Sequence, residues 1–345
     1  PLILSFRNTD HPGTLTDGIP VDPVNSTRGI LMRYRFVTLD VFTQQRFGGN
    51  PLAVFPEAAG LSTEQMSQIA REFNLSETAF VLPPQDPRHS HRVRIFTPNS
   101  ELAFAGHPTV GTAFALAQMG MIPPQGNPTT LVLEEGIGSV PVTLHWGSRG
   151  VETVYLTAAQ LPEPGPQPPH PAVLADILGI PEEAIVTGSW SPQSFSCGLP
   201  FLFVAVRERQ VLQQLRLDLS LWQRELASFW APQVYVLWRD PAVVEPDKFR
   251  IAARMFAPGL GIVEDPATGS AAAALAGYLT AATGQISYIC QIEQGYEMGR
   301  PSQLELVTKG SQGHLAVIKV GGSAVMVSEG WMQVTDPEGI EPENP

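Results

Sequence analysis

The sequence RIFTP at residues 94–98, followed by HPTVGTA at residues 107–113, occurs a second time one domain later in altered form. The second copy reads RMFAP at residues 254–258 and DPATGSA at residues 265–271. Both copies follow the pattern R-x-F-x-P, a short spacer and [HD]-P-x-x-G-[ST]-A, and each runs into an alanine-rich segment typical of a closely packed helix. The shared order favours an internal duplication over two ordinary helix starts that match by coincidence.

Each copy also carries the signature of a helix start. A polar residue directly before a proline is typical of helix N-termini, so we expect His107 and Asp265 in or near the capping positions. Asp is the better cap, so capping explains Asp265 better than His107. Helix starts have unpaired N–H groups and partial positive charge, and two that face each other predict a cup for a small anion such as a carboxylate.

The composition indicates a folded protein that does not bind polyanions. A length of 345 residues predicts about two domains, and 43% hydrophobic residues supply the material for their cores. The formal net charge is −12 and Lys and Arg form no cluster, which argues against nucleic acid and anionic membranes as partners. The longest apolar stretch, residues 271–282, is broken by Gly277 and predicts a buried helix rather than a membrane span.

Cysteine and histidine usage predicts neither a disulfide framework nor a metal site. The two cysteines, Cys197 and Cys290, are too few for either a disulfide scaffold or a structural zinc site, and we expect both to be structural. The seven histidines show no metal-ligand spacing, so we predict no metal. These features, without a signal peptide, favour a cytoplasmic protein.

The order of the predicted elements divides the chain into two lobes. Residues 1–32 have no sustained periodicity and are expected to be a disordered extension. We predict an N-terminal lobe at residues 33–160, a C-terminal lobe at 161–330 and a tail at 331–345, with the proline-rich run 161–171 as the hinge.

Helices and strands are predicted to follow a similar order in both lobes. In the first lobe we expect strands at 34–42, 52–55, 75–82 and 91–96 and a helix that begins after Ser62; in the second we expect helices at 171–178 and 212–227 and strands at 201–206, 233–237, 249–256, 304–307, 315–320 and 324–328. Such alternation predicts an α+β or mixed-sheet fold that is built twice.

Five segments, in this order, resemble the PhzF-like phenazine-biosynthesis isomerase family: FGGNPLAV at 47–54, NLSETAF at 74–80, FAGHPT at 104–109, EDPATGSA at 264–271 and GRPS at 299–302. The resemblance extends from about residue 34 to about residue 330. It implies a fold similar to that of diaminopimelate epimerase: two pseudo-symmetric lobes, each a mostly antiparallel or mixed sheet wrapped around a central helix, with the active site in the cleft.

The resemblance also implies a chemistry. Glu77 would take a proton from one carbon of a small carboxylate-bearing substrate and return it to another, without a cofactor, as in a trans-2,3-dihydro-3-hydroxyanthranilate isomerase. His107 and Asp265 would be its partners, and the protein would be a homodimer. Apolar neighbours would desolvate Glu77 and raise its pKa towards the range of a general base, whereas without the resemblance a Glu exposed on a strand is the simpler interpretation.

Substrate contacts are expected around the two helix starts. The backbone near Gly106, Gly269 and Ser270 would bind the substrate carboxylate, and Thr268 and Ser76 are further candidates.

Three other residues have two interpretations each. Asn50 is either a turn residue or a substrate contact. Arg300 either binds the substrate carboxylate or forms a salt bridge that fixes a loop. Glu101 either pairs with a nearby arginine or contacts substrate.

Two alternatives to the isomerase remain. The epimerase relatives carry a cysteine at each helix start, but the corresponding places here are Gly106 and the neighbourhood of Asp265, so racemisation by two thiols is not expected. A racemase or epimerase that uses Glu77 with a different second base is one alternative. A non-catalytic ligand-binding protein with the same fold is the other.

Overall fold

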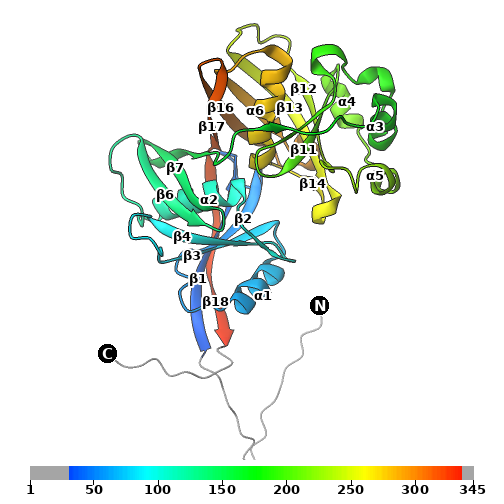
Figure 1. Cartoon of the computed structure of the whole chain (residues 1–345). Helices are drawn as coiled ribbons and strands as arrows, with labels where there is room; N and C mark the ends of the chain where they lie inside the picture. Colours follow the sequence, from blue (N-terminus) through cyan, green and yellow to red (C-terminus); the bar gives the residue numbers. More distant parts are fainter. Residues whose placement is uncertain (1–30, 336–345) are drawn as a thin grey trace, which may run out of the picture. The chain divides into compact units, whose positions relative to one another are not determined.

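A computed structural model describes residues 31–335 (Figure 1). The first part of the chain contains β1 (Leu31–Val41), β2 (Asn50–Phe55), α1 (Thr63–Phe73), β3 (Glu77–Leu82), β4 (His91–Phe96), β5 (Glu101–Leu102), α2 (Gly106–Gln118), β6 (Thr129–Glu135), β7 (Gly138–Gly147) and β8 (Gly150–Thr157). We call this part the first half.

The second half contains β9 (Glu163–Pro164), α3 (Pro171–Leu178), η1 (Glu182–Ala184), η2 (Gly188–Trp190), β10 (Gln193–Ser196), β11 (Pro200–Ala205), α4 (Arg209–Gln214), α5 (Leu219–Glu225), β12 (Gln233–Arg239), β13 (Lys248–Ala257), η3 (Pro258–Leu260), β14 (Ile262–Asp265), α6 (Gly269–Thr283), β15 (Tyr288–Gln294), η4 (Tyr296–Met298), β16 (Ser302–Ser311) and β17 (His314–Gly322). The last strand is β18 (Ala324–Thr335).

The two halves repeat one pattern of strand pairing. In the first half β1 pairs antiparallel with β2, β2 parallel with β3, and β3 antiparallel with β4. Strand β4 pairs antiparallel with β5 and parallel with β6, and β6, β7 and β8 follow as antiparallel neighbours. Strands β10 to β17 repeat every one of these pairings in the same order. The mixed α+β fold and its internal repeat are therefore as predicted.

Strand pairing also joins the halves into one mixed sheet of 18 strands. The last strands of the two repeats, β8 and β17, pair antiparallel, with Leu156 opposite Val320. Strand β18 then returns to the first half and pairs with β1, where the Thr38 and Ser328 hydroxyls lie 2.6 Å apart. Residues 331–335 thus belong to a strand that begins before the predicted tail, and the predicted lobe boundary at residue 160 stays a prediction.

A buried helix lies at the centre of each half (Figure 1). Every residue of α2 from Gly106 to Ala117 is buried, and α6 is buried from Ala271 to Leu279. Small side chains let both helices approach the strands closely. A Cβ atom at Gly111 would lie only 2.6 Å from Leu52 Cδ2, so glycine is needed there for α2 to pack against the sheet.

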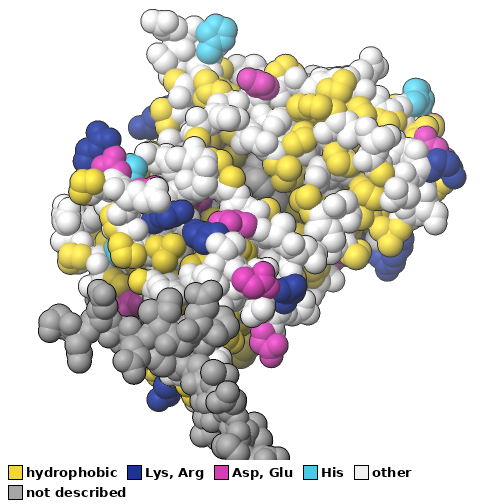
Figure 2. All heavy atoms as spheres, turned by 60° about the horizontal axis from the view of Figure 1, so that its bottom comes forward, with side chains coloured by type: hydrophobic (Ala, Val, Ile, Leu, Met, Phe, Trp, Pro, Cys, Tyr) yellow, Lys and Arg dark blue, Asp and Glu magenta, His cyan; other side chains and the backbone are white. Residues whose placement is uncertain are grey.

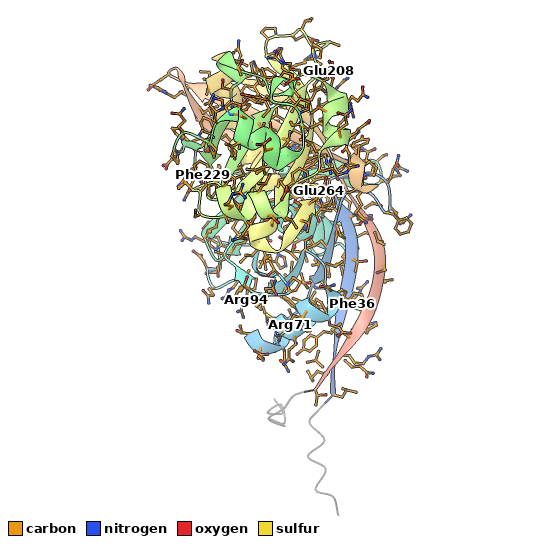
Figure 3. The ribbon with its side chains drawn as sticks, turned by 90° about the vertical axis from the view of Figure 1, so that its right-hand side faces the viewer. Phe36, Arg71, Arg94, Glu208, Phe229 and Glu264 are labelled. Atoms are coloured by element: carbon orange, nitrogen blue, oxygen red, sulfur yellow. The ribbon has the colours of Figure 1, made fainter. Side chains whose placement is uncertain are left out.

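The repeated R-x-F motif forms the same interaction in both halves. Arg94 on β4 pairs through two hydrogen bonds of 2.7 Å with Glu101 and lies over the Phe96 ring. Arg254 on β13 pairs in the same way with Glu264, at 2.8 and 2.7 Å, and lies over Phe256. Figure 3 marks Arg94 in the first half and Glu264 in the second. The sequence repeat therefore corresponds to a repeated structural unit.

The helix starts differ from the prediction. The N-cap residues are Ala105 and Thr268, and neither forms a side-chain capping bond. His107 is the second residue of α2, and Asp265 ends β14 before α6 begins. Both residues lie within three positions of an N-cap, but neither occupies it or caps the helix, because α2 begins before the His-Pro pair whereas α6 begins after the Asp-Pro pair.

Other local predictions agree with the structure. Ser62 forms a capping box with Gln65 at the start of α1, and α3 spans the predicted residues 171–178. The predicted helical region 212–227 is divided into two short helices, because Asp218 caps a new helix in its middle. The predicted extension lies, apart from residues 31 and 32, outside the described residues.

Candidate active site

A cavity of about 540 Å³ lies where the starts of α2 and α6 meet. We call it the central cavity. It is lined by seven of the nine predicted site residues: Glu77, Gly106, His107, Asp265, Thr268, Gly269 and Ser270. The other two, Ser76 and Asn50, do not line it. Ser76 is half-buried beside Glu77, and Asn50 has a different position, described below.

Glu77 begins β3 and is 8% exposed at the wall of the central cavity. Burial raises its pKa from 4.5 to about 8, and the nearby charge of Asp265 adds to the increase. Its Oε2 atom has no hydrogen-bond partner among the described residues. At pH 7 this carboxyl is therefore mostly protonated, and roughly a tenth of the molecules carry it ionised.

His107 places its imidazole directly opposite this carboxyl. Its Nε2 atom lies 3.4 Å from Glu77 Oε2 and has no hydrogen-bond partner among the residues described, while the ring binds the backbone of Pro51. Pro51 has no N–H, so the ring donates to its carbonyl and does so through Nδ1. Burial lowers the pKa of His107 to about 3, against the effect of that bond. The ring is therefore neutral, with its proton on Nδ1 and an unprotonated Nε2.

The neutral acid Glu77 thus lies next to the neutral base His107 at the cavity wall. The proton between the two groups is on Glu77, and the lone pair of His107 Nε2 is its nearest acceptor in this pair. A small movement of either side chain would bring the two atoms within hydrogen-bond distance. The pair can therefore hold one proton ready for transfer without a net charge.

Asp265 also lines the cavity, where its side chain is buried and held by two donors. Its Oδ1 atom accepts a bond of 2.9 Å from Asn50 Nδ2, and its Oδ2 atom accepts one of 2.6 Å from the Thr268 hydroxyl. Burial raises its pKa to about 6, and these two bonds oppose the increase. Asn50 also donates to the Ala267 carbonyl. Asn50 therefore links the two halves behind Asp265 and positions its carboxylate.

The starts of α2 and α6 are in direct contact. A Cβ atom at Gly106 would lie 3.1 Å from Gly269 Cα and 3.3 Å from the backbone nitrogen of Ser270. The two glycines thus allow both helix N-termini to approach the same point of the cavity. No side chain caps either helix start, and the cup of N–H groups for a negatively charged group stays a prediction.

The remaining wall is mostly apolar. Side chains of this kind come from both halves: Leu102, Phe104, Ile137, Leu156, Leu199, Phe201, Met255, Leu260 and Ile262. No Lys or Arg is among the described lining residues. On the face shown in Figure 2, acidic and basic side chains are scattered, and hydrophobic ones gather towards its upper right.

Cys197 also lines the central cavity, which its sequence position does not indicate. Its Sγ atom donates to the Gln160 carbonyl, and burial raises the thiol pKa to about 11. The side chain is therefore a thiol and not a thiolate at neutral pH. Cys290 is fully buried and does not line the cavity.

Two residues with alternative interpretations form salt bridges. Arg300 pairs with Asp40 and donates to the carbonyls of Gly48 and Gly49, so it fixes the turn before Asn50. Glu101 is occupied by Arg94. Neither residue lines the central cavity.

A buried amide behind Asp265 is not indicated by any of the sequence motifs. Gln294, at the end of β15, donates to the Asp265 carbonyl at 2.7 Å and to the Thr268 hydroxyl at 3.0 Å. Its oxygen accepts from the Thr268 N–H. Gln294 therefore fixes the segment between β14 and α6. In the part of the chain that is described, no group of His, Cys, Asp and Glu side chains could hold a metal ion, and no helix is long and apolar enough to cross a membrane.

Known proteins share this architecture and sequence. A model of the PhzC-PhzF family of phenazine biosynthesis-like proteins matches residues 39–330. A relative from Mesorhizobium japonicum, named an uncharacterized isomerase, is 43% identical over 304 residues, covering 86% of this chain and 97% of the relative. The trans-2,3-dihydro-3-hydroxyanthranilate isomerase of Pseudomonas aeruginosa is 36% identical over 311 residues, covering 86% of this chain and 98% of that enzyme.

The fold agrees with a solved member of the family. A PhzF-family phenazine biosynthesis protein from Bacillus anthracis superposes with a TM-score of 0.77 at 23% identity, covering 88% of this chain and 100% of that chain. Both of the relatives described above match over nearly their whole length and are named isomerases. The chain therefore belongs to the family of phenazine biosynthesis-like proteins, and it is an isomerase.

Proposed function

We propose that Glu77 moves a proton between two carbons of a small carboxylic acid bound in the central cavity, with His107 and Asp265 as its partners. The observation that carries this proposal is the 3.4 Å approach of Glu77 Oε2 to His107 Nε2. Both atoms are buried at a cavity wall and have no other hydrogen-bond partner in the described part of the chain.

The reaction needs one group that both accepts and donates a proton. In its ionised form, the Glu77 carboxylate takes the proton from the first carbon, and the electron pair of the broken C–H bond is delocalised into the substrate. The neutral acid then returns the proton to the second carbon, so that atoms and charge balance without a co-reactant. A pKa near 8 suits both steps, because neither form of the carboxyl is rare near neutral pH.

The two helix starts would bind the substrate carboxylate. Negative charge that develops as the proton leaves would be stabilised by the same N–H groups around Gly106 and Gly269, which are already in place before the reaction. The neutral His107 ring would orient the Glu77 carboxyl, and the Asp265 carboxylate would accept a hydrogen bond from a substrate hydroxyl or amine.

The substrate class follows from the wall of the cavity. A wall rich in leucine, isoleucine and phenylalanine suits a ring or another apolar body attached to the carboxylate. The substrate of the Pseudomonas aeruginosa relative, trans-2,3-dihydro-3-hydroxyanthranilate, has a carboxylate on a six-membered ring and is the first compound to test. A racemase that uses two thiolates is not supported, because Cys197 is the one cysteine at the cavity and its thiol pKa is raised.

The test compares the wild-type protein with Glu77→Gln on this compound and on a panel of cyclic and amino carboxylic acids in D₂O. NMR follows both the conversion and the position of deuterium. We expect conversion by the wild-type protein and a loss of about 10³-fold or more in Glu77→Gln, because the amide cannot carry the proton. Glu297→Gln, which changes an exposed glutamate in the same way, should retain full activity.

The position of the label separates the competing functions. Deuterium or a rearranged double bond at a second carbon supports the isomerase, whereas exchange with inversion at a single carbon supports a racemase. Equal turnover by wild-type and Glu77→Gln proteins would contradict the role of Glu77. Binding without any conversion across the panel would favour a ligand-binding protein.

A further inference from the structure

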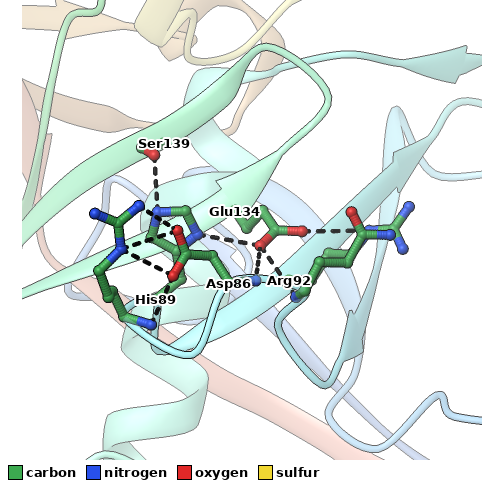
Figure 4. A network of polar contacts seen from close by, with 7 residues as sticks. Asp86, His89, Arg92, Glu134 and Ser139 are labelled. Atoms are coloured by element: carbon green, nitrogen blue, oxygen red, sulfur yellow. Dashed lines mark hydrogen bonds and ion pairs between the residues drawn. The ribbon is translucent and has the colours of Figure 1, made fainter.

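A third carboxyl, in addition to Glu77 and Asp265, is buried close to the central cavity. Glu135, the last residue of β6, is 6% exposed, whereas its neighbour Glu134 points to the other face of the strand. Glu134 accepts hydrogen bonds from the backbone N–H groups of Gln85 and Asp86, and it lies 3.1 Å from the His89 ring (Figure 4). Glu134 thus stabilises the surface of the β6–β7 hairpin, and Glu135 faces the interior.

The interior partner of Glu135 is the first turn of α2. Its Oε1 atom lies 2.7 Å from the Thr109 hydroxyl oxygen, which also lies 2.8 Å from the Ala105 carbonyl oxygen. A threonine hydroxyl has a single hydrogen and can donate fully to only one of two acceptors. If Thr109 donates to Ala105, the hydrogen of the second contact must come from the Glu135 carboxyl.

The surroundings of Glu135 favour this neutral form. Its Oε2 atom has no hydrogen-bond partner among the described residues, which would be costly for a buried carboxylate. Two arginines line the neighbouring surface recess, but Arg94 pairs with Glu101, and Arg92 faces Glu134 at 3.9 Å. Burial raises the Glu135 pKa to about 8, although the Thr109 hydrogen bond opposes it.

The turn after Glu135 is fixed to the wall of the central cavity. A Cβ atom at Gly136 would lie 2.7 Å from Ala103 Cα, so the turn is in contact with the segment that leads into α2. The Ile137 N–H donates to the Ala103 carbonyl at 3.1 Å, and the Ile137 side chain itself lines the cavity. Glu135 therefore lies between the cavity wall and the helix start that carries His107.

We propose that Glu135 is a positioning residue of the isomerase: as a neutral acid it donates to Thr109, Thr109 donates to the Ala105 carbonyl, and this chain fixes the start of α2 at the substrate site. The helix has no side-chain cap at Ala105, and this chain instead holds the Ala105 carbonyl from within the first turn. The proposal rests on the proposed function only in that it takes the start of α2 as part of the substrate site.

The test uses variants that separate a neutral donor from a charged acceptor. Glu135→Gln keeps a donor of similar shape, Glu135→Leu removes it, and Thr109→Val removes the hydroxyl. Thr112→Val is the matched control, because the Thr112 hydroxyl is one turn further along α2, is equally buried and has no hydrogen-bond partner among the described residues. Amide hydrogen exchange at residues 105–109, kcat and KM are measured for each variant.

We expect Glu135→Gln and Thr112→Val to keep kcat within about threefold of the wild-type value. Glu135→Leu and Thr109→Val should lower kcat by about tenfold or more, because a displaced helix start misplaces His107. The same two variants should accelerate amide exchange at residues 105–109. In a ¹³C NMR titration of the wild-type protein, the Glu135 carboxyl should remain protonated at pH 7.

Three results would overturn the proposal: a Glu135→Gln variant as defective as Glu135→Leu, a Glu135 carboxyl that is ionised at pH 7, or unchanged amide exchange in Thr109→Val. The titration and the exchange measurement need no substrate. If no compound is converted, the proposed function fails while the result for Glu135 remains decisive.

Discussion

The two halves share their scaffold and differ where they meet the central cavity. Both have the same strand pairing, a buried central helix and an Arg–Glu pair whose arginine lies over a phenylalanine ring. At the cavity the first half supplies a neutral imidazole, His107, whereas the second supplies a carboxylate, Asp265, that is held by Asn50 and Thr268. The repeat therefore preserves the fold, and the chemistry lies in the positions at which the copies diverge.

The largest effect on turnover is expected from a change of His107, the residue of the first half that lies next to the Glu77 carboxyl. His107→Asn removes the imidazole whose Nε2 atom lies 3.4 Å from Glu77 Oε2, so kcat should fall by about 10³-fold. Steady-state turnover with the best substrate measures the change. His145→Asn, an exposed histidine on β7, should leave kcat unchanged. An active His107→Asn variant would contradict the role of His107 as the partner of Glu77.

The repeated Arg–Glu pairs provide a second comparison. The side chains of Arg254 and Glu264 are only 8% and 15% exposed, whereas those of Arg94 and Glu101 are 17% and 40% exposed. Arg254→Met should therefore lower the free energy of unfolding by about 3 kcal/mol, because it leaves Glu264 buried without its partner. Arg94→Met should lower it by about 1 kcal/mol or less. Urea unfolding of both variants decides whether the equivalent pairs differ in this way.

Both raised carboxyl pKa values in the first half predict that stability depends on pH. Glu77 and Glu135 have pKa values of about 8 in the folded protein and ordinary values near 4.5 when unfolded, so the folded state holds their protons more tightly. Their contribution is complete below pH 4.5 and is lost as the pH rises through 8.

The free energy of unfolding should accordingly decrease between pH 5.5 and 8.5, by about 3 kcal/mol for each of these carboxyls. Urea unfolding at the two pH values measures this decrease. It should be smaller in Glu135→Gln, whereas Glu297→Gln should show the full wild-type decrease. A stability that rises over this interval would contradict the protonated state of both carboxyls.

The smallest effect is expected in the second half. Asp265→Asn removes a charge that raises the Glu77 pKa, but it leaves the contact between Glu77 and His107 in place. We expect kcat to fall by about tenfold, and the acid limb of the kcat/KM profile to move to lower pH. A limb that moves to higher pH would show that Asp265 is not charged beside Glu77.

The sequence predicted the repeated fold well because its signals are local. The capping box at Ser62 and the helix at residues 171–178 depend on neighbouring residues, and both are present. The helix starts were harder to place, because the aligned glycines have different surroundings. Gly111 packs against the sheet inside α2, whereas Gly269 begins α6 and contacts Gly106. Tertiary packing, which the motif does not contain, decides where each helix begins.

The sequence predicted most of the residues that line the cavity, but it did not indicate Glu135 and Gln294, which hold the segments behind them. The resemblance to a family directed attention to Glu77, His107 and Asp265, which the structure brings to one cavity. Glu135 was missed because two glutamates before a Gly-Ile-Gly turn are typical of an exposed hairpin. Gln294 was missed for a related reason, since its partners are nearly thirty residues away, and strand alternation alone cannot indicate them.

The proposed role of Glu77 depends most on whether its carboxyl carries the proton shared with His107. A ¹³C NMR titration of protein labelled at glutamate carboxyls, with Glu77→Gln to assign the signal, measures this without a substrate. We expect the Glu77 carboxyl to be protonated at pH 7 and to titrate with a midpoint near 8. A carboxyl that is ionised from pH 5.5 upwards, next to a protonated His107, would contradict it.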